Sequence, residues 1–565
     1  MYRAFAYLEE FRGKIFTGAI PNVFELFLIS EARFPSSNCF TSFYPEKTTY
    51  TYTEAKKKIY DFAGALIDKG VKKGELVILT GKNSIEWAVS YLAILAAGGI
   101  VVPLDYQFSE AEMENIISFT DARVLIIDEE KYDGIGKASG KEFVKFSLSK
   151  NNANYIFDMT AKSLEKQIPV APDEMAAILF TSGTTGNPKG VMLTHSNLAH
   201  DALLAQMNLV ILQTDVFYAI LPLHHSYTML AVFIETIAVG AELVFASKLV
   251  VSQMLLDLKQ GNVTMFLGVP MLFNRILKGI LKGIREKGIV VFGIIKMLLF
   301  ISGFIKKLFG KNIGKKLFKS VLKKASLSSI RICISGGGPL PPSTFKIYNQ
   351  LGLNFVQGYG LTETSPIVAL NPVEHFKIKS VGKMLPSVEA KIIDPDHDGR
   401  GEIALRGPVI MKGYYKNPEA TKEVLMEDGF FLSGDVGYLD SENYLYLTGR
   451  KKSLIVTEGG KNVFPEEIED KFQLYDEIEQ VFVRGYIKDK KNRSEEIEAL
   501  FYPSEELRNK YSKEENHEKI KKIVHEINMG SPQYMWITKT GILDKPLEMT
   551  STKKIKRYKY KEEIE

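Results

Sequence analysis

The sequence predicts a multidomain α/β protein, and three observations support this fold class. The chain has 565 residues, more than a single hydrophobic core usually serves, which favours about two to four domains. Apolar residues make up 45% and charged residues 25% of the chain, proportions typical of folded soluble domains. From about residue 50 to 270, runs rich in Val, Ile and Leu alternate with helical patterns, as in α/β units.

Each expected helix or strand follows from a local pattern of apolar residues. Apolar runs predict strands, and three- and four-residue apolar spacing predicts a helix over 84–97. The strand-like runs of this region are LVILT (76–80), GGIVVPLD (98–105), ARVLIID (122–128) and AELVFAS (241–247). From about 378 to 449 the pattern changes to short strands separated by Gly, Asp and Asn, which predicts a small β subdomain.

After Gly449 the composition changes and the chain becomes dense in Lys and Glu. The strand-like runs VFVRGYI and EALFYP, with helical patterns over 465–473 and 513–528, predict a domain that mixes strands and helices. We therefore place a boundary at Arg450. It separates a large N-terminal domain, residues 1–449, from a C-terminal domain, residues 450–565.

Composition also indicates the cellular compartment and excludes some classes of binding partner. The two cysteines, Cys39 and Cys333, have no CxxC spacing, so they support neither a disulfide framework nor a structural cysteine-zinc site. A reducing cytoplasm is expected. The N-terminal stretch MYRAFAYLEEFRGKIF carries acids among its apolar residues, so no signal peptide is expected. The formal net charge of +5 does not by itself indicate a nucleic-acid partner.

One window, residues 275–324, concentrates positive charge and apolar residues. It holds fourteen Lys and Arg side chains and one acid, Glu286, which gives a local charge of +13. Within it, GIVVFGIIKMLLFISGF (288–304) is interrupted by Lys296, which makes it a marginal membrane span. From Ile305 to Leu322, apolar residues recur at helical spacing between lysines, which is typical of a basic amphipathic helix.

This basic apolar window predicts a surface that docks on anionic lipid. The alternative is a pair of core helices with lysines on the solvated side. Nucleic acid fits less well, because aromatic side chains for base stacking are few and a long apolar stretch has no role against phosphate. No internal repeat or long low-complexity segment is apparent.

A glycine-rich loop carries the first chemical signal. In AAILFTSGTTGNPKGVMLTH (176–195), two apolar strands flank a loop of Ser, Thr and Gly that exposes backbone N–H groups, as phosphate binding requires. Lys189 adds a positive charge. The loop is not a P-loop, because Gly183 and Gly186 are too close together and Gly190 follows the lysine. A glycine hairpin without a ligand is the alternative.

Five ordered motifs resemble those of the adenylate-forming enzymes, a family of acyl-CoA synthetases, carrier-protein ligases and luciferases. The motifs are SGTTGNPKG (182–190), QGYGLTETSP (357–366), LSGDVGYLD (432–440), LTGRKKSLIVTEGGKNVFPEEIE (447–469) and MTSTKKIKR (549–557). Members make an acyl-adenylate from ATP and a carboxylate. The resemblance implies an N-terminal domain of two α/β subdomains and a small β-barrel-like subdomain, followed by a mobile α+β C-terminal lid.

The resemblance also implies contacts for ATP and Mg²⁺. The residues that it places at the nucleotide are Thr181, Ser182, Gly183, Thr184, Thr185, Gly186, Lys189, Gln357, Gly358, Tyr359, Gly360, Thr362, Asp435 and Arg450. Glu363, with Thr184, would bind Mg²⁺, which prefers a carboxylate plus phosphate oxygens. The ring of Tyr359 would lie on adenine, and Asp435 and Arg450 would hold the ribose.

Two further positions correspond to two poses of the lid. Lys554 would bridge the α-phosphate and the attacking carboxylate, and so is the catalytic residue expected for adenylation. Gly460 would let the pantetheine arm of CoA pass close to the backbone. Lys452 matches the hinge position, where Asp or Lys is usual. Ser453 stands where an acid is usual, which leaves one hinge contact unassigned.

The acyl substrate is suggested by LPLHHSYTM (221–229) and ICISGGGPL (332–340). His225 lies where acyl-activating members carry a His and amino-acid-activating members carry an Asp. Gly337, between Gly336 and Gly338, would leave room for an acyl chain. With the basic apolar window, these features resemble long-chain fatty acid–CoA ligases, so we expect a peripheral enzyme on the inner face of the cell membrane.

Two alternatives remain at this point. A ligase that loads a fatty acid onto an acyl carrier protein shares every motif and differs only in the thiol acceptor. A non-catalytic membrane-binding protein on the same fold would be expected to lack Glu363 or Lys554, and both are present.

Overall fold

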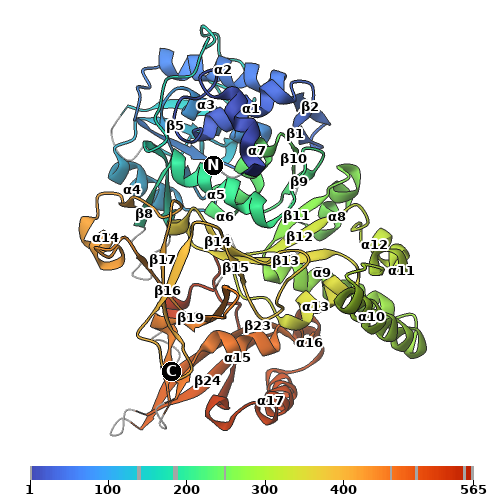
Figure 1. Ribbon diagram of the computed structural model, residues 1–565. Coiled ribbons are helices and arrows are strands. Elements are labelled where there is room, and N and C mark those ends of the chain that lie inside the picture. Colours follow the sequence, from blue (N-terminus) through green and yellow to red (C-terminus); the bar gives the residue numbers. More distant parts are fainter. Residues whose placement is uncertain are drawn as a thin grey trace.

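The computed structural model describes residues 3–136, 142–181, 189–246, 250–457, 461–489, 494–550 and 555–560. Figure 1 shows layered sheets and helices for the N-terminal residues and a smaller C-terminal domain, in orange to red, against the lower side of the view. The molecule is α/β, with a large N-terminal domain and a smaller C-terminal domain, as the sequence predicts.

The first sheet is mostly parallel, and the described residues give it seven strands in the order β18-β8-β7-β4-β3-β5-β6. Its strands are β3 (Leu76–Thr80), β4 (Ile100–Leu104), β5 (Val124–Ile127), β6 (Val144–Ser147), β7 (Met175–Thr181), β8 (Lys189–Thr194) and β18 (Gly413–Tyr414). Strands β3, β4 and β5 fall on predicted apolar runs, whereas β6 was not predicted. Both faces of β3 and β4 are covered, which explains why these strands are continuously apolar rather than alternating.

The second sheet has thirteen strands in the described residues, in the order β16-β17-β19-β20-β15-β14-β13-β12-β11-β9-β10-β1-β2. Its parallel part comprises β1 (Asn38–Ser42), β9 (Val216–Ala219), β10 (Glu242–Phe245), β11 (Met265–Gly268), β12 (Ile332–Ser335) and β13 (Asn354–Gly360), with β2 (Thr48–Thr51) antiparallel at the edge. The predicted β region continues the same sheet. Strand β14 (Ile367–Leu370) precedes this region, which contributes β15 (Gly382–Met384), β16 (Glu389–Ile393), β17 (Gly401–Arg406), β19 (Phe431–Leu439) and β20 (Tyr444–Arg450) to the sheet.

Helices fill the space between the two sheets and cover their outer faces. The largest hydrophobic core joins residues of both sheets to the helices between them, α1 (Val23–Arg33), α2 (Tyr52–Asp68), α3 (Ile85–Ala96), α5 (His195–Asn208) and α7 (Glu235–Val239). Helix α4 (Glu110–Thr120) packs on the outer side of the first sheet. A second core lies on the outer side of the second sheet, under α8 (Val251–Gln260), α9 (Pro270–Arg285) and α13 (Pro342–Gln350).

The C-terminal domain has its own core, built around a three-stranded sheet in the described residues. Its elements are β21 (Ile455–Val456), β22 (Asn462–Val463), α15 (Pro465–Phe472), β23 (Ile478–Asp489), β24 (Ser494–Pro503), α16 (Glu505–Lys510), α17 (Lys513–Met529) and β25 (Ile537–Ile542). It contacts helix α9 of the larger domain. Asn274 Nδ2 donates to Gln473 Oε1 at 2.7 Å, and Lys278 Nζ donates to the Tyr475 carbonyl at 2.7 Å.

The basic apolar window begins within α9 and continues as one long helix followed by two short ones. Helix α10 (Ile289–Phe309) ends at Gly310, whose φ of +66° suits glycine, and α11 (Gly314–Leu317) and α12 (Lys319–Lys324) follow. The continuous amphipathic helix predicted from Ile305 to Leu322 is therefore wrong. Phe318 and Leu322 are buried in the second core, so part of its apolar pattern belongs to the interior.

Helix α10 projects from the right side of the molecule in Figure 1. By length and composition it is sufficient to cross a bilayer, and only 11% of its most apolar window is buried. Its inner side is held by protein, because Leu299 and Ser302 are buried and Lys306 Nζ donates to Asn349 Oδ1 of α13 at 2.8 Å.

His195 is the first residue of α5, directly after strand β8, and it is hydrogen-bonded to helix α1. Its buried Nδ1 accepts a hydrogen bond from the Val23 backbone N–H at 3.3 Å, and burial lowers its pKa from 6.5 to about 4. The unfolded chain takes up a proton near pH 6.5, whereas the folded chain does so only near pH 4. The stability from this neutral imidazole is therefore complete above pH 6.5 and is lost as the pH falls towards 4.

We expect His195→Asn to flatten the acid dependence of stability, because the amide oxygen can accept the same hydrogen bond and does not titrate. The wild type should lose about 3 kcal/mol more than the variant between neutral and acid pH, from the size of the pKa shift. Urea unfolding at a series of pH values measures this difference. Parallel pH profiles for the two proteins would contradict it.

Candidate active site

The carboxyl ends of strands from both sheets meet at one edge, where ligands bind in open α/β sheets. A single side chain fixes this junction. Asn83 follows β3 of the first sheet, and its Nδ2 donates to the carbonyls of Ala219 (3.0 Å) and Leu221 (2.8 Å) after β9 of the second sheet. Its Oδ1 accepts from the Leu223 N–H at 2.9 Å. The loop that carries the two histidines is thereby tied to the first sheet.

Three residues from the predicted nucleoside motifs form one hydrogen-bonded group. Tyr359 Oη donates to Asp435 Oδ2 at 2.6 Å, and Arg450 Nε lies 2.7 Å from Asp435 Oδ1. Antiparallel pairing of β19 and β20 places Asp435 opposite Arg450. Burial and the facing carboxylate raise the pKa of Tyr359 well above its usual value, so this hydroxyl remains a donor. The structure thus brings together residues of three separate motifs.

Glu363 lies in a 3₁₀ turn, Thr362–Thr364, directly after β13 and beside β8 and β18. Its Oε1 accepts from Tyr414 Oη at 2.8 Å, and the Lys189 ammonium lies 4.8 Å from the centre of the Tyr414 ring. Burial and the Glu363 carboxylate raise the pKa of Tyr414. A carboxylate, a cation and hydroxyl groups therefore converge where β7 ends at Thr181.

These oxygen donors suit Mg²⁺, because a hard cation prefers a carboxylate and hydroxyl or phosphate oxygens to nitrogen or sulfur. Gly360, just before the turn, has no room for a side chain, since a Cβ atom there would lie 1.5 Å from the Pro366 carbonyl oxygen. This close approach positions the turn. Gln357 and Gly358 precede it on β13, with Gln357 buried beside the end of β12.

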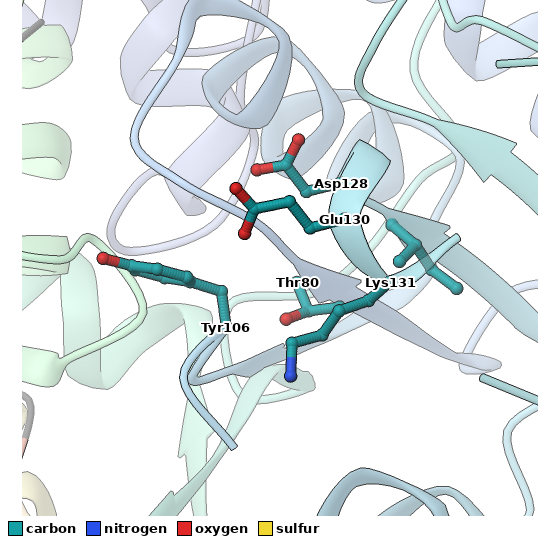
Figure 2. Close-up of a pocket in the computed structure, with 6 residues that line it drawn as sticks. Thr80, Tyr106, Asp128, Glu130 and Lys131 are labelled. Atoms are coloured by element: carbon teal, nitrogen blue, oxygen red, sulfur yellow. The ribbon is translucent and has the colours of Figure 1, made fainter. Parts of the chain in front are cut away.

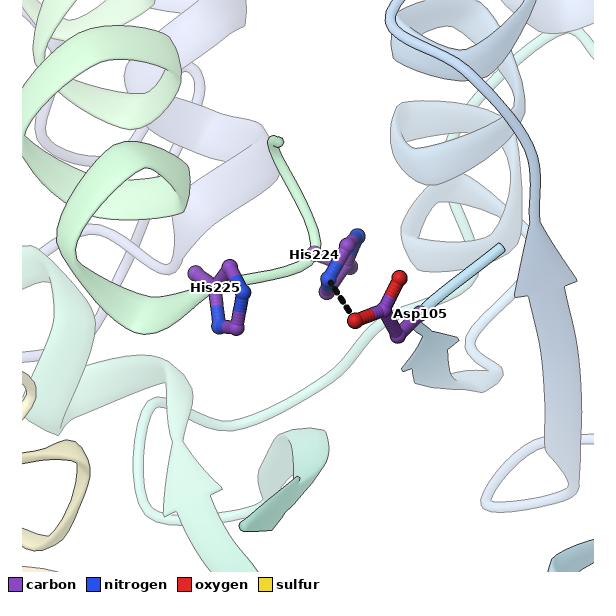
Figure 3. Close-up of side chains that lie close together, drawn as sticks. All are labelled: Asp105, His224 and His225. Carbon is purple, nitrogen blue, oxygen red and sulfur yellow. Dashed lines mark ion pairs between the residues drawn. The ribbon is translucent and has the colours of Figure 1, made fainter. Parts of the chain in front are cut away.

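His225 lies at the start of the short helix α6 (Ser226–Thr228). Ser226 Oγ lies 3.1 Å from Thr362 Oγ1, which joins the histidine loop to the Glu363 turn. Figure 3 shows His225 next to His224, whose Nε2 is 3.5 Å from Asp105 Oδ2 at the end of β4. The two imidazole rings have their centres 4.3 Å apart.

The glycine turn after β12 partly fits the predicted acyl pocket. A Cβ on Gly336 would lie 2.8 Å from the Tyr227 ring, so that side chain already occupies the space. At Gly337 and Gly338 the nearest atoms, from Val269 and Pro270, would lie at 3.8 and 3.7 Å, which is ordinary contact. Room beside this turn is therefore restricted to the last two glycines.

Several predicted residues lie outside the part of the chain that the structure describes. They are Ser182, Gly183, Thr184, Thr185, Gly186, Gly460 and Lys554. Lys556, two positions after Lys554, is described, and its Nζ lies 4.0 Å from Glu548 Oε2 in the C-terminal domain. The pKa of Glu112, at the start of α4, is lowered first by the backbone N–H of Ser109 and further by the Lys556 charge. The hinge residues Lys452 and Ser453 lie in a 3₁₀ turn directly after β20.

Two cavities lie elsewhere among the described residues. Figure 2 shows the first, of about 10 Å³, lined by Thr80, Tyr106, Ile127, Asp128, Glu130 and Lys131. It is large enough for about one water molecule, which the buried hydroxyl of Thr80 would bind. The second, of about 570 Å³, is lined by Phe5, Ala19, Ile20, His200, Leu203, Leu204, Ser387 and Pro408. Neither contains a predicted site residue.

The sequence analysis missed four side chains of this site: Tyr414, Ser226, Asp105 and His224. Tyr414 follows a glycine in KGYYKN, and its position against Glu363 depends on the pairing of β18 with β8. Asp105 is an acid directly after an apolar strand, which is a usable signal in an α/β protein. Its partner on another sheet could not be identified without the tertiary structure.

Two family models match the chain. Residues 29–415 match the model described as AMP-binding enzyme, and residues 452–565 match the AMP-binding enzyme C-terminal domain. Among curated proteins, the chain is 30% identical to "Long-chain-fatty-acid--[acyl-carrier-protein] ligase AEE15, chloroplastic" of Arabidopsis thaliana, over 91% of this chain and 82% of the relative. It is also 30% identical to "Long-chain-fatty-acid--CoA ligase" of Bacillus subtilis, over 81% of each chain.

A solved structure supports the same comparison. The fold is similar to that of ATP-bound MatB from Rhodopseudomonas palustris, with a TM-score of 0.76, 25% identity and coverage of 95% of this chain and 98% of that one.

We expect Glu363→Gln to weaken Mg²⁺-dependent ATP binding by at least about tenfold, because the amide keeps the shape but loses the charge that a hard dication needs. High Mg²⁺ should restore only part of the loss. Tyr414→Phe keeps the carboxylate and removes its donor, so the loss should be smaller, about threefold to tenfold. Calorimetric titration with ATP at several Mg²⁺ concentrations measures both. If Glu363→Gln retained the wild-type metal dependence, the metal ligand would lie elsewhere.

Proposed function

Because the chain belongs to the AMP-binding enzyme family, we propose that it is a fatty acid–CoA ligase that acts on long-chain acids. In the first step a fatty acid carboxylate attacks the α-phosphorus of ATP, which gives acyl-AMP and pyrophosphate. In the second, the thiol of CoA displaces AMP and gives the acyl thioester. Activation of a carboxylate as its adenylate, with ATP, Mg²⁺ and CoA as reactants and cofactor, makes this protein an acid–thiol ligase.

One observation carries this proposal: residues from four separate nucleotide motifs meet at a single edge of the two sheets. Tyr359, Asp435 and Arg450 form the group suited to a nucleoside, and Glu363 lies in the turn that follows β13, the strand of Tyr359. Lys189 brings the end of the glycine-rich loop to this point. A catalyst for adenylation must bring two anions together, which requires such a concentration of donors and cations.

The chain's own residues would divide the work of the first step. Thr362, Lys189 and the loop before it would hold phosphate oxygens, and Asp435 and Arg450 would hold the ribose. Mg²⁺, when bound at Glu363, would neutralise charge on the triphosphate. Lys554 is proposed to reach the reacting carboxylate from the C-terminal domain. The match of MTSTKKIKR, residues 549–557, to the C-terminal lysine motif supports this assignment.

The assignments of the acyl substrate and of the thiol acceptor rest on fewer observations. His225 in place of an acid disfavours a substrate ammonium, and the space beside Gly337 and Gly338 suits an apolar chain. The Bacillus relative is named for CoA and the Arabidopsis relative for acyl carrier protein. We favour CoA, with the carrier protein as the alternative acceptor.

We further propose that the enzyme is peripheral on the inner face of the cell membrane, bound through helix α10. The outward side chains are large and apolar: Ile289 is 86% exposed, Val290 72% and Phe300 66%. Exposed lysines flank them at 307, 316, 323 and 324, and attraction to anionic headgroups is worth about 1 kcal/mol for each basic residue near the surface. Since α13 and α9 hold the inner side, the helix would lie along the interface rather than across the bilayer.

The structure shows that some lysines of the C-terminal half of the large domain bond to protein and are therefore not assigned a contact with lipid headgroups. Lys306 bonds Asn349, and burial lowers its pKa to about 8. Lys315 Nζ donates to the Ile330 carbonyl at 2.7 Å, and Lys278 bonds Tyr475. These three side chains hold protein elements together, so the exposed lysines carry the proposed contact.

The enzymatic proposal is tested by pyrophosphate release with carboxylates of increasing chain length, with CoA or with acyl carrier protein. Long-chain acids should be activated best, and the acyl thioester should form on CoA. Lys554→Ala should abolish acyl-AMP formation while leaving thioester formation from supplied acyl-AMP largely intact. Gly460→Leu should do the reverse, because a branched side chain would block the path of the pantetheine arm.

Equal loss of both half-reactions in both variants, with folding intact, would contradict the two-pose mechanism. Transfer only to the carrier protein would establish the alternative acceptor instead.

The membrane proposal is tested by co-sedimentation with anionic vesicles. Changing Lys307, Lys316, Lys323 and Lys324 to Gln should weaken binding by about tenfold or more, from four lost headgroup contacts. The same change at four exposed lysines of the C-terminal domain, Lys510, Lys513, Lys521 and Lys522, is the matched control and should have little effect. High salt should weaken wild-type binding without abolishing it, since apolar insertion is not screened. Wild-type protein that stays in the supernatant at low salt would overturn the proposal.

A further inference from the structure

Asp105, His224 and His225 bring three metal-ligating side chains together beside the candidate active site (Figure 3). We propose that they form a binding site for a divalent transition-metal ion such as Zn²⁺, separate from the Mg²⁺ residues around Glu363. The ligands come from both sheets, because Asp105 follows β4 of the first and the histidines lie in the loop after β9 of the second.

The spacing of the donor atoms fits one ion. Four-coordinate zinc with bonds near 2.0–2.1 Å holds its ligand atoms about 3.3 Å apart. His224 Nε2 and Asp105 Oδ2 are already 3.5 Å apart. One donor atom from each of the three residues lies within 4.8 Å of the others. A side-chain rotation at His225 would bring its ring nitrogen to coordination distance from the same ion.

A second, independent observation is the environment of His224. Its side chain is 5% exposed, and Nε2 is buried without a hydrogen-bond partner among the described residues, although it faces the Asp105 carboxylate. A buried imidazole nitrogen normally has a partner. An ion held beside the Asp105 carboxylate would give this nitrogen the partner that it lacks.

The donor set selects the kind of metal. Two imidazoles and one carboxylate suit Zn²⁺, Co²⁺ or Ni²⁺, whereas Mg²⁺ prefers oxygen ligands in an octahedral shell. Three protein ligands also leave a fourth position open. The Glu363 corner has the opposite character, with carboxylate and hydroxyl oxygens from Tyr414 and Thr362, so the two sites would discriminate between the two metals.

The surrounding structure holds these ligands in place. Asn83 ties the loop before the histidines through Ala219, Leu221 and Leu223, as described above. The start of α6 fixes the other side, because the Met229 N–H donates to the His225 carbonyl at 2.8 Å. A ligand pair that is held rigidly binds metal with less loss of side-chain entropy.

Occupation of this site would inhibit the enzyme, and this consequence rests on the proposed function. His225 adjoins Ser226, which contacts Thr362 beside the Glu363 turn, so an ion here lies where the fatty acid carboxylate is expected. The bound ion would occupy the space that this carboxylate must enter. Zn²⁺ should therefore compete with the fatty acid rather than with CoA.

A second group of possible metal ligands in the same chain serves as a control for the zinc-binding experiment. Asp396, His397 and Asp398 also have donor atoms within 4.8 Å of one another, but all three are exposed and lie in a turn of the small β region. This set lacks burial and a second imidazole, so we expect it to bind Zn²⁺ weakly.

The test is equilibrium titration of the full chain with Zn²⁺, and with Co²⁺ as a spectroscopic probe, in the presence of Mg²⁺ and without substrate. The wild type should bind one ion tightly and give the visible absorption of four-coordinate Co²⁺. His224→Gln and Asp105→Asn should each weaken binding by about tenfold or more, from the loss of one ligand. His397→Gln should leave affinity and activity unchanged. Circular dichroism and urea unfolding establish that each variant is folded.

Equal affinity in the wild type and in both folded variants, His224→Gln and Asp105→Asn, would overturn the proposal, as would loss of the tight site in His397→Gln. A separate assay of adenylation measures inhibition by Zn²⁺ at several fatty acid concentrations and its reversal by a zinc-selective chelator. Metal binding without competition would refute the inhibitory role alone. An inactive enzyme that still binds Zn²⁺ through His224 would refute the proposed function and not the metal site.

Discussion

The three hydrogen bonds of Asn83 are the interaction on which the arrangement of the site depends. They join the end of β3 in one sheet to the loop after β9 in the other. The two sheets share one hydrophobic core with the helices between them, and apolar burial is non-directional, so it does not by itself fix their relative position. Directional hydrogen bonds with fixed donors and acceptors define it to within a fraction of an ångström. The histidine loop, and through Ser226 the Glu363 turn, take their positions from this junction.

The two carboxylates of the site, Asp435 and Glu363, differ in the groups that they are paired with. Asp435 is buried between the Tyr359 hydroxyl and the Arg450 guanidinium, so its carboxylate is held in one orientation before any ligand binds. Glu363 has a neutral donor, Tyr414, which orients the carboxylate without neutralising it. A carboxylate with its charge uncompensated attracts a cation, whereas one paired with Arg450 serves as a hydrogen-bond acceptor. The two carboxylates therefore offer different chemistry, since Glu363 suits a cation and Asp435 suits hydrogen-bond donors.

Helix α10 shows how the same segment can serve the core and a surface. Leu299 and Ser302 pack inward, while Ile289, Val290 and Phe300 extend away from the protein. Water disfavours such a large exposed apolar surface, by about 25 cal/mol for each Å². The helix keeps its position because its second half is fixed to α13 through Lys306 and Asn349. A rigid attachment would let a docked helix hold the whole enzyme at a set orientation.

The sequence alone determined the elements and the chemistry that depend on local patterns. The apolar runs at β3, β4 and β5, the helix after Ser84 and the five ordered motifs needed only neighbours in the chain, because strand and helix periodicity are local properties. The division of the region from Ile305 to Leu322 was not foreseen, since Gly310 ends α10 and tertiary packing buries Phe318. Only the tertiary structure placed Tyr414 on Glu363 and Asp105 beside His224, because strand pairing and sheet packing join residues that no local spacing relates.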